Sequence, residues 1–369
     1  MAKRIQGTTP MQDGFWMPAE YEEHERVWMC WPERTDNWRD GAKPAQEAYI
    51  EVAKAISRFE PVTMLVSSVQ FANARNMLPS EVQVVEASYN DAWARDIGPS
   101  FLVNSEGELR ACDWTFNAWG GLVDGLYFPW DKDDALAQKI CELVGADSYR
   151  TEGFVLEGGS FHVDGAGTIL TTEMCLLSEG RNSHMNKWEI EKKLKEYLNA
   201  NKVIWLKMGI DPEETNGHID DVACFIAPGE VVCIYEENRA SPFYLPSHQA
   251  YEQLLKETDA QGNPLTVHQL CCPKQAVYIE AGARIDRTGN AMIRTENTRC
   301  IASYANFLIV NGGVIVPQYG DENDTLAIAQ LEELFPNRKV VGVYTKEIVY
   351  GGGNIHCITQ QQPKTRMNI

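Results

Sequence analysis

Two short segments carry side chains that together favour covalent chemistry at a thiol. Near the C-terminus, three glycines precede a cysteine in the run Gly351-Gly352-Gly353-Asn354-Ile355-His356-Cys357. A second segment, Asn216-Gly217-His218-Ile219-Asp220-Asp221, places an imidazole and a carboxylate two residues apart. A thiol nucleophile works with an acid/base group and an orienting carboxylate, and glycines before it let backbone and substrate approach closely. The two segments therefore predict covalent cysteine chemistry.

Each segment alone has a simpler interpretation. A glycine-rich run is most often an ordinary turn, and a single cysteine such as Cys357 is most often a small buried apolar residue. An aspartate such as Asp96 or Asp220 is most often a surface or turn carboxylate. The functional interpretation therefore depends on motifs in other parts of the chain.

Strand-like and helix-like patterns alternate along the sequence. Apolar, β-branched runs predict strands at 62–66, 101–103, 168–170, 203–206, 231–235, 307–310 and 340–344. Apolar residues at helical spacing predict helices around 49–56, 136–144, 190–198, 251–255 and 326–334, the last with Asp324 as its N-cap. Segments without a motif, including 257–273, are interpreted as surface and linker structure. Five helical segments interleaved with strands, and no low-complexity linker, predict about five α/β units in one domain over residues 1–369.

The candidate polar residues recur at an interval that agrees with this repetition. Asp96 and Glu157 are 61 positions apart, and Glu157 and His218 are again 61 positions apart. Equal spacing would place each residue at a similar point of successive units, facing a shared centre. Two equal intervals also arise by chance, so the spacing supports the five-unit interpretation without deciding it.

Composition narrows the class of protein. The chain is 44% hydrophobic and 23% charged, no apolar stretch reaches the length of a bilayer span, and its first residues contain no apolar run, so we expect a cytoplasmic protein. Ten cysteines without a CxxC pair predict reduced thiols. A formal net charge of −19 disfavours nucleic acid and anionic membranes as partners. Such charge also serves solubility alone, but it is compatible with a small cationic ligand.

Four polar segments together resemble those of the agmatine deiminases, a branch of the guanidine-modifying pentein superfamily. The segments are Trp93-Ala94-Arg95-Asp96-Ile97-Gly98-Pro99, Leu156-Glu157-Gly158-Gly159-Ser160, Asn216-Gly217-His218-Ile219-Asp220 and the run that ends at Cys357. The resemblance covers nearly the whole chain, from Met17-Pro18-Ala19-Glu20-Tyr21 through Ser303-Tyr304-Ala305-Asn306-Phe307 to Pro317-Gln318-Tyr319-Gly320-Asp321. It implies a five-bladed α/β propeller with pseudo-fivefold symmetry and the active site on its axis, and it implies a homo-oligomer.

The resemblance also implies a role for each site residue. Asp96 and Asp220 hold the planar guanidinium, whose permanent charge makes its central carbon a reluctant electrophile. Cys357 attacks that carbon, expels ammonia and leaves an amidino-cysteine intermediate. His218 protonates the ammonia and then activates the hydrolytic water, while Glu157 orients His218. No cofactor and no metal is implied.

The implied substrate is agmatine, which is hydrolysed to N-carbamoylputrescine and ammonia. Agmatine lacks the carboxylate of arginine and carries a distal amine, so its site needs an acidic or aromatic acceptor instead of an arginine clamp. Glu214 is expected to pair with the amine. Trp93 and Trp119 are expected to line the channel through apolar and cation–π contacts.

Other activities stay open at this point. An arginine deiminase, a dimethylarginine hydrolase or an amidinotransferase would use the same fold and similar residues. A metallohydrolase would draw on His218, Asp220, Asp221 and His356, but no HExxH or three-histidine pattern accompanies them. A non-catalytic guanidinium-binding or scaffold protein has no use for a thiol, so the intact set of site residues around Cys357 disfavours it.

Overall fold

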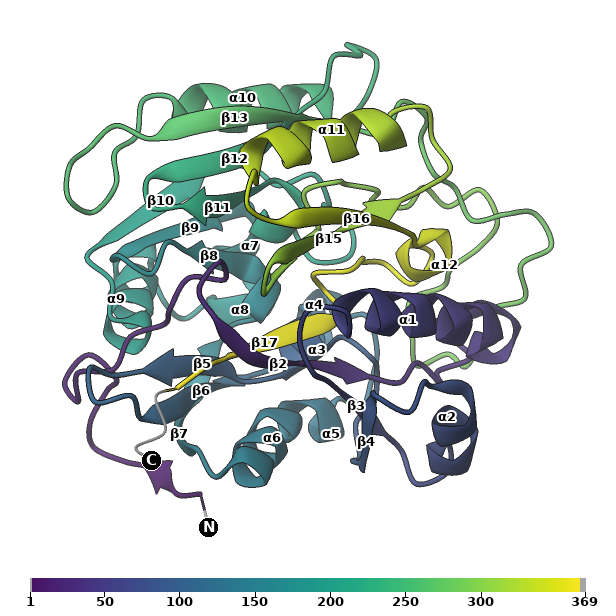
Figure 1. The fold of residues 1–369 in the computed structure, drawn as a ribbon, viewed down its shortest axis with the longest axis horizontal. Coiled ribbons are helices and arrows are strands. Elements are labelled where there is room, and N and C mark those ends of the chain that lie inside the picture. Colours follow the sequence, from purple (N-terminus) through teal and green to yellow (C-terminus); the bar gives the residue numbers. More distant parts are fainter. Residues whose placement is uncertain (1, 366–369) are drawn as a thin grey trace.

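The computed structural model describes residues 2–365, which adopt a mixed α/β fold (Figure 1). Their strands form five separate sheets. The strands are β1 (Arg4–Ile5), β2 (His24–Cys30), β3 (Val62–Val66), β4 (Gln83–Glu86), β5 (Ser100–Val103), β6 (Leu109–Thr115), β7 (Asp147–Val155), β8 (Phe161–Val163), β9 (Thr168–Thr172), β10 (Lys202–Leu206), β11 (Ala223–Ala227), β12 (Glu230–Tyr235), β13 (Thr266–Cys271), β14 (Leu308–Val310), β15 (Gly313–Gln318), β16 (Lys339–Tyr344) and β17 (Thr359–Pro363). The predicted α/β class is confirmed.

The five sheets share one strand arrangement. In each, a short first strand pairs antiparallel with a second, and the second pairs parallel with a third. The triplets are β5-β6-β7, β8-β9-β10, β11-β12-β13, β14-β15-β16 and β17-β2-β3. The last triplet joins the C-terminal β17 to β2, so segments from the first and last parts of the chain lie in one sheet, whereas β1 pairs with β7 in another. This repetition agrees with the prediction of about five α/β units.

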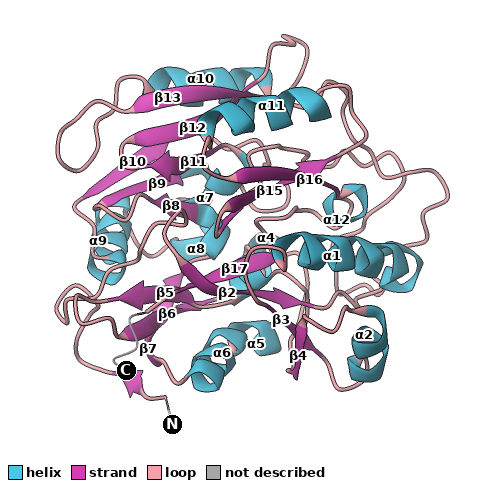
Figure 2. Cartoon of the chain, viewed as in Figure 1, coloured by secondary structure: helices cyan, strands magenta, loops and turns pink. Residues whose placement is uncertain are grey.

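The helices lie mainly around the outside of the sheets (Figure 2). They are α1 (Lys43–Ile56), α2 (Phe71–Met77), α3 (Ala94–Ile97), α4 (Gly121–Asp124), α5 (Asp131–Asp134), α6 (Leu136–Val144), α7 (Glu173–Leu176), α8 (Glu179–Asn182), α9 (Lys187–Leu198), α10 (Tyr244–Leu254), α11 (Asp324–Leu334) and α12 (Lys346–Val349), with 3-10 turns η1 (Arg39–Ala42), η2 (Gly158–Ser160) and η3 (Ile219–Asp221). All five predicted helices are present, as are all seven predicted strands. Among residues 2–365, no helix combines the length and the apolar character that crossing a bilayer requires.

Local signals explain where the longer helices begin and end. A proline in the first turn of α1 fits a position where no backbone N–H is needed. Asn186 and Glu189 form a reciprocal capping box at the start of α9. Gly145 ends α6 with φ of 72°, in the left-handed region that glycine adopts easily. Each of these signals acts within a few residues, so the ends of these helices are set by local sequence.

Two local predictions need correction. Asp324 is the first residue of α11, and Asn323 occupies the N-cap. The carboxylate of Asp324 instead accepts backbone N–H groups from Tyr319 and Gly320, so it stabilises the turn that precedes the helix. Residues 257–273 contain a strand, β13, which pairs with β12. Only Leu270 of β13 is buried, so the strand depends on backbone pairing and lacks the apolar pattern that marks the others.

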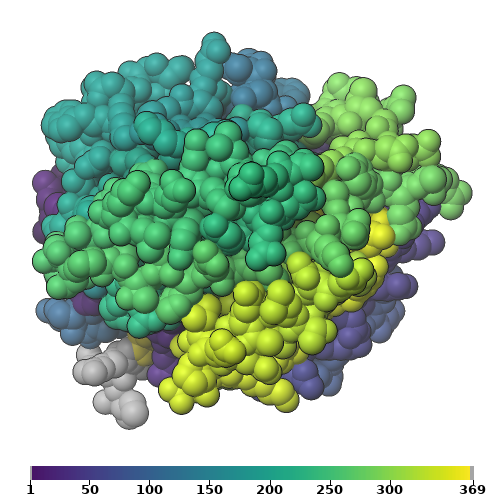
Figure 3. All heavy atoms as spheres, turned by 90° about the horizontal axis from the view of Figure 1, so that it is seen from above, coloured from purple at the N-terminus to yellow at the C-terminus, as the bar shows by residue number. Residues whose placement is uncertain are grey.

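Neighbouring units pack closely on the outer surface. Helix α11 contacts β16 of its own sheet and β13 of the next one. From above, the segments that carry α10 and α11 lie side by side on one face (Figure 3). On the inner side, α3 and η2 contact each other, as do η2 and η3, and each lies just before the first strand of its sheet. The inner turns of successive sheets therefore meet.

Candidate active site

The inner turns bring together the five residues predicted as catalytic. Asp96 lies in α3, Glu157 precedes η2, Asp220 lies in η3 after His218, and Cys357 precedes β17. Each of these residues is at most 5% exposed. The imidazole of His218 lies between carboxylates: Nε2 is 3.6 Å from Oε2 of Glu157, and Nδ1 is 3.9 Å from Oδ2 of Asp96. Residues that are far apart in sequence thus form one buried cluster.

Cys357 faces an amide and a carboxylate. Its Sγ is 3.1 Å from Nδ2 of Asn306 and 3.6 Å from Oδ2 of Asp220. Oδ1 of Asn306 also accepts the backbone N–H groups of His356 and Cys357, which fixes the loop that carries the thiol. Burial raises the pKa of the Cys357 thiol well above its ordinary value, and the negative charge of Asp220 adds to this. The buried and negatively charged surroundings therefore favour the neutral thiol.

The surroundings of His218 favour its charged form, whereas those of Cys357 favour the neutral thiol. Burial disfavours the charged form of His218. Asp96, a hydrogen bond that the ring donates to Cys175, and Glu157 outweigh burial and raise the pKa of His218 well above its ordinary value. Glu157 is ionised: burial raises its pKa, but Arg181, with Nε 3.0 Å from Oε1, and His218 together lower it. The site therefore holds an imidazolium beside a carboxylate and ready to donate a proton.

Asp96 is fixed from two sides. Its Oδ1 accepts the backbone N–H of Gly159 at 2.8 Å, and its Oδ2 accepts the indole N–H of Trp119 at 2.9 Å. Gly159 lies so close to the cluster that a Cβ there would be 2.6 Å from Nδ1 of His218, 2.9 Å from Oδ2 of Asp220 and 3.0 Å from Oδ1 of Asp96. The absence of a side chain at Gly159 lets these three groups converge.

We expect Gly159→Ala to lower kcat about 100-fold, because displacing reacting groups by about 1 Å costs that much. The backbone of Gly159 lies outside the left-handed region, so the substitution acts through contact and not through backbone strain. A matched control is Gly153→Asn, at an exposed glycine with φ of 73° and open space around it. Steady-state kinetics and thermal unfolding of both variants check this. Equal kcat values for the two variants would contradict the close-approach argument.

A pocket opens onto the thiol. Cys357, Asp96, Trp93, Trp119 and Glu214 line it. Asp220, which was also predicted to bind substrate, is not among the lining residues and reaches the site through its contact with Sγ of Cys357. The ring of Trp93 stacks on Trp38, with centroids 5.1 Å apart, and meets the edge of Trp119 at 6.4 Å. The pocket therefore combines aromatic walls with carboxylates, which suits an elongated cation.

Glu214 is engaged by a buried arginine. Its Oε1 and Oε2 lie 2.6 Å and 2.8 Å from the two terminal nitrogens of Arg294, whose Nε donates to Asn37 at 2.7 Å. The second arginine of the pocket wall, Arg34, likewise pairs with both oxygens of Asp36 at 2.7 Å and 3.0 Å. Both guanidinium groups of the wall are thus already bound to carboxylates.

Several residues of the site were not assigned by sequence reasoning. Asn306 holds the thiol, Arg181 holds Glu157, and Arg294 holds Glu214. Asn306 had a detectable signal, because it lies before β14 as Asp96 lies before β5, in a segment that already contributed to the family resemblance. Arg181 and Arg294 lie in segments with no such signal.

Two buried groups combine metal-ligand types within 4.8 Å, among the residues that the structure describes. One consists of Glu157, Cys175 and His218, and the other of Glu20, His162 and His356. A guanidinium lies beside each: Arg181 binds Glu157, and Arg95 is 3.7 Å from Glu20. A fixed positive charge at that distance opposes a metal dication, so neither group is a favourable metal site.

Fold and site together define a class: mixed α/β proteins in which a buried cysteine, an imidazole and several carboxylates surround a pocket suited to a cation. Known proteins give the class a name. Residues 16–363 match the family model of Porphyromonas-type peptidyl-arginine deiminases. A Lactococcus lactis protein assigned as an agmatine deiminase is 67% identical over 366 residues, which cover 99% of this chain and 100% of that protein.

Solved structures agree with this match. The agmatine deiminase of Enterococcus faecalis superposes with a TM-score of 0.98 at 66% identity, covering 98% of this chain and 100% of that one. A substrate-bound cysteine-to-serine variant of the C. jejuni agmatine deiminase gives a TM-score of 0.82 at 30% identity, covering 98% of each chain. The chain belongs to the Porphyromonas-type peptidyl-arginine deiminase family, among its agmatine deiminases.

Proposed function

We propose that this protein is an agmatine deiminase, which hydrolyses the guanidinium of agmatine to N-carbamoylputrescine and ammonia through an amidino-cysteine intermediate. The observation that carries the choice of substrate is the pairing of both pocket arginines with carboxylates, Arg294 with Glu214 and Arg34 with Asp36. An arginine substrate needs a partner for its α-carboxylate, and these guanidinium groups are already bound. Agmatine has no carboxylate to place.

The guanidinium of agmatine binds between Asp96 and Asp220. One oxygen of Asp220, Oδ1, is buried without a hydrogen-bond partner among residues 2–365, so it is available to accept a substrate N–H. The bound cation offsets the negative charges that, after burial, raise the pKa of the Cys357 thiol. Substrate binding therefore favours the thiolate in the complex in which it is needed.

Covalent chemistry follows at Cys357. The thiolate attacks the central carbon and forms a carbon–sulfur bond, and a carbon–nitrogen bond then breaks as His218 donates its proton to the departing ammonia. Neutral His218 next takes a proton from water, and the resulting hydroxide attacks the amidino carbon. The carbon–sulfur bond breaks and the sulfur leaves as thiolate. The hydroxyl proton then passes to the sulfur, which restores the thiol and releases the neutral carbamoyl product. Glu157 stabilises the imidazolium in both half-reactions.

The distal amine of agmatine lies toward Glu214, beside the rings of Trp93 and Trp119. Glu214 shares its charge with Arg294, so the amine meets a carboxylate that is already held in place and needs no rearrangement. The aromatic rings contribute cation–π attraction and exclude water from the methylene chain.

We infer, beyond this, that the five sheets are the blades of a five-bladed propeller whose axis passes through the site. The repeated strand arrangement and the meeting of the inner turns support this inference. We also propose that residues 1–369 form one catalytic domain. As separate proposals, the protein acts in the cytoplasm and assembles as a homo-oligomer. A small cation is its ligand, and nucleic acid and membrane are not partners.

The decisive experiment compares ammonia release from agmatine and from arginine at matched concentrations, with intact-mass analysis of the acid-quenched enzyme. We expect release from agmatine, at least 100-fold slower release from arginine, and an amidino adduct on the agmatine-treated chain. Faster turnover of arginine would overturn the substrate assignment and keep the chemistry. An adduct that reacts with an added amine in place of water would indicate an amidinotransferase.

A further inference from the structure

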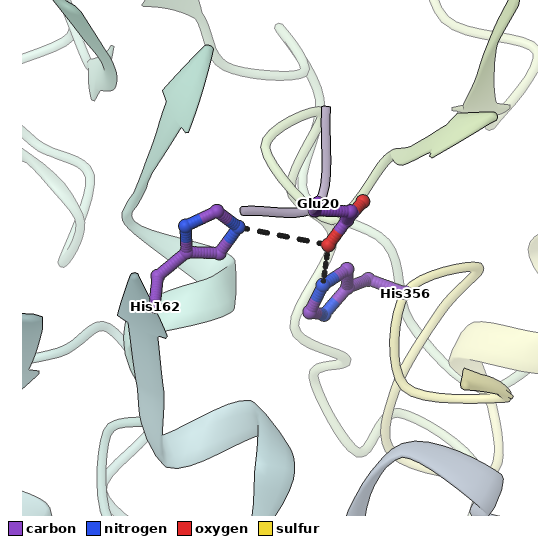
Figure 4. Close-up of side chains that lie close together, drawn as sticks. All are labelled: Glu20, His162 and His356. Atoms are coloured by element: carbon purple, nitrogen blue, oxygen red, sulfur yellow. Dashed lines mark hydrogen bonds and ion pairs between the residues drawn. The ribbon is translucent and has the colours of Figure 1, made fainter. Parts of the chain in front are cut away.

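A buried chain of hydrogen-bonded side chains lies behind the site, and the proposed chemistry does not use it. Figure 4 shows three members, Glu20, His162 and His356, with the two rings directed at the Glu20 carboxylate. Glu20 precedes β2, His162 lies on β8, and His356 directly precedes Cys357. Each is at most 6% exposed. The chain of side chains links the N-terminal segment to the loop that carries the thiol.

Hydrogen bonds determine the protonation of His356. Its Nδ1 is 2.9 Å from Oδ2 of Asp220, and its Nε2 is 2.8 Å from Oε2 of Glu20. Because an ionised carboxylate only accepts hydrogen bonds, each ring nitrogen must carry a proton. Burial and the charge of Arg95 oppose this, but Glu20 and Asp220 outweigh them and raise the pKa of His356. His356 is therefore an imidazolium between two carboxylates.

The neighbouring His162 faces the same Glu20 carboxylate but differs from His356 in its protonation. Its Nδ1 accepts the backbone N–H of Phe225 at 3.3 Å, so its proton is on Nε2, which lies 3.6 Å from Oε2 of Glu20. Burial lowers the pKa of His162. A neutral ring satisfies both contacts, so His162 is a matched comparison for His356.

The hydrogen bonds to the Glu20 carboxylate also indicate that Glu20, His162 and His356 form a hydrogen-bonded group and not a metal site. Oε1 of Glu20 accepts the backbone N–H of Ile309 at 2.8 Å, and its Oε2 accepts from His356. The guanidinium of Arg95 lies 3.7 Å from Oε2 and also binds the carbonyl of His356 at 3.2 Å and the side chain of Gln361 at 2.7 Å. These bonds satisfy both oxygens of Glu20 without a cation.

We propose that Glu20 and His356 are positioning residues that keep Asp220 ionised and hold its free oxygen toward the substrate. Burial disfavours the Asp220 anion, and the hydrogen bond from His356 is the leading interaction that offsets it and keeps the pKa of Asp220 low. With Oδ2 held by His356, Oδ1 stays unpaired among the described residues and lies 4.0 Å from Nδ1 of His218. The kinetic consequences of this proposal rest on the deiminase function. The charge assigned to His356 does not.

The pH dependence of kcat/KM tests the proposal. The titratable and charged groups around His356 are Asp220 and Cys357 on the site side and Glu20, Arg95 and His162 behind it. Glu20→Gln removes the negative partner and lowers the pKa of His356, so the alkaline limb of the profile moves to lower pH by about one unit. His356→Gln removes the cation beside Asp220 and raises the pKa of that carboxyl, so the acid limb moves to higher pH.

At the wild-type pH optimum, kcat/KM falls about 10- to 100-fold in Glu20→Gln and in His356→Gln. Losses of this size are typical when a residue that orients a functional side chain is replaced. His162→Gln is the control, because it removes a buried histidine from the same carboxylate but has no bond to Asp220. In His162→Gln, the acid and alkaline limbs of the kcat/KM profile stay at their wild-type pH values. Equal losses at every pH in Glu20→Gln and His356→Gln would mean that the pair is only structural, and the proposal would be wrong.

Nuclear magnetic resonance of the 15N-histidine-labelled wild type tests the charge directly and needs no variant to be active. We expect both ring nitrogens of His356 to remain protonated at pH 8, with the signal assigned by its shift in Glu20→Gln. An unprotonated nitrogen would overturn the proposal. A doubly protonated His356 in an enzyme that releases no ammonia from agmatine would instead overturn the deiminase function and leave the charge assignment in place.

Discussion

Cys357→Ser is expected to lower kcat with agmatine by about 10⁴-fold or more while agmatine binding changes less than about threefold. A serine hydroxyl is far less acidic than a thiol, and the charge of Asp220, only 3.6 Å from Sγ, opposes forming any further anion there. The guanidinium contacts proposed for Asp96 and Asp220 do not involve the thiol and should remain intact. Ammonia release measures the first effect, and calorimetric titration of agmatine measures the second.

The thiol control is Cys271→Ser, which changes a half-buried free cysteine on the strand β13. Its kcat should equal that of the wild type. Intact-mass analysis should show an adduct on the wild type and on Cys271→Ser, and none on Cys357→Ser. A serine variant at position 357 that retains more than about one hundredth of the wild-type kcat would exclude attack by this thiol.

His218→Gln is expected to lower kcat by about 10³-fold. In the proposed mechanism one imidazole serves both half-reactions, and each proton transfer contributes about 10² to 10⁴. Glutamine keeps a similar volume but neither donates a proton to ammonia nor removes one from water. The amide also lacks the charge that Asp96 and Glu157 stabilise in the wild type. Single-turnover measurements of ammonia release and of adduct decay should both be slow.

His248→Gln is the matched control for His218→Gln. His248 lies outside the site, between the rings of Tyr235 and Tyr244, and binds the backbone carbonyl of Glu236. Its substitution should leave kcat within about twofold of the wild type. If ammonia release in the first turnover of His218→Gln were as fast as in the wild type, a different group would protonate the leaving ammonia.

Sequence patterns located the elements whose formation depends on short-range signals. The strand at 62–66 was found because every side chain of β3, between β2 and β4, is buried and four of the five are apolar. The helix at 136–144 was found because its apolar positions recur at helical spacing. β13 was missed for the opposite reason, since one buried residue in six leaves no pattern to detect.

The sequence by itself determined the chemical types at the site and their repeat. Asp96, Glu157 and His218 recur at equal spacing because each lies just before the first strand of a successive sheet, at the same point of a repeated arrangement. A local signal repeated in each unit is visible without knowing how the units pack. The cysteine after the glycine run has the same kind of signal.

Tertiary structure alone decided which side chains hold those groups and in what state of charge. Glu20 meets His356 across 336 positions, Arg294 meets Glu214 across 80, and Asn306 meets Cys357 across 51. These contacts form only when the inner turns of different sheets meet, and burial there makes each charge depend on its neighbours. The imidazolium of His356 follows from the two carboxylates around it, and no local pattern near His356 in the sequence encodes that pairing.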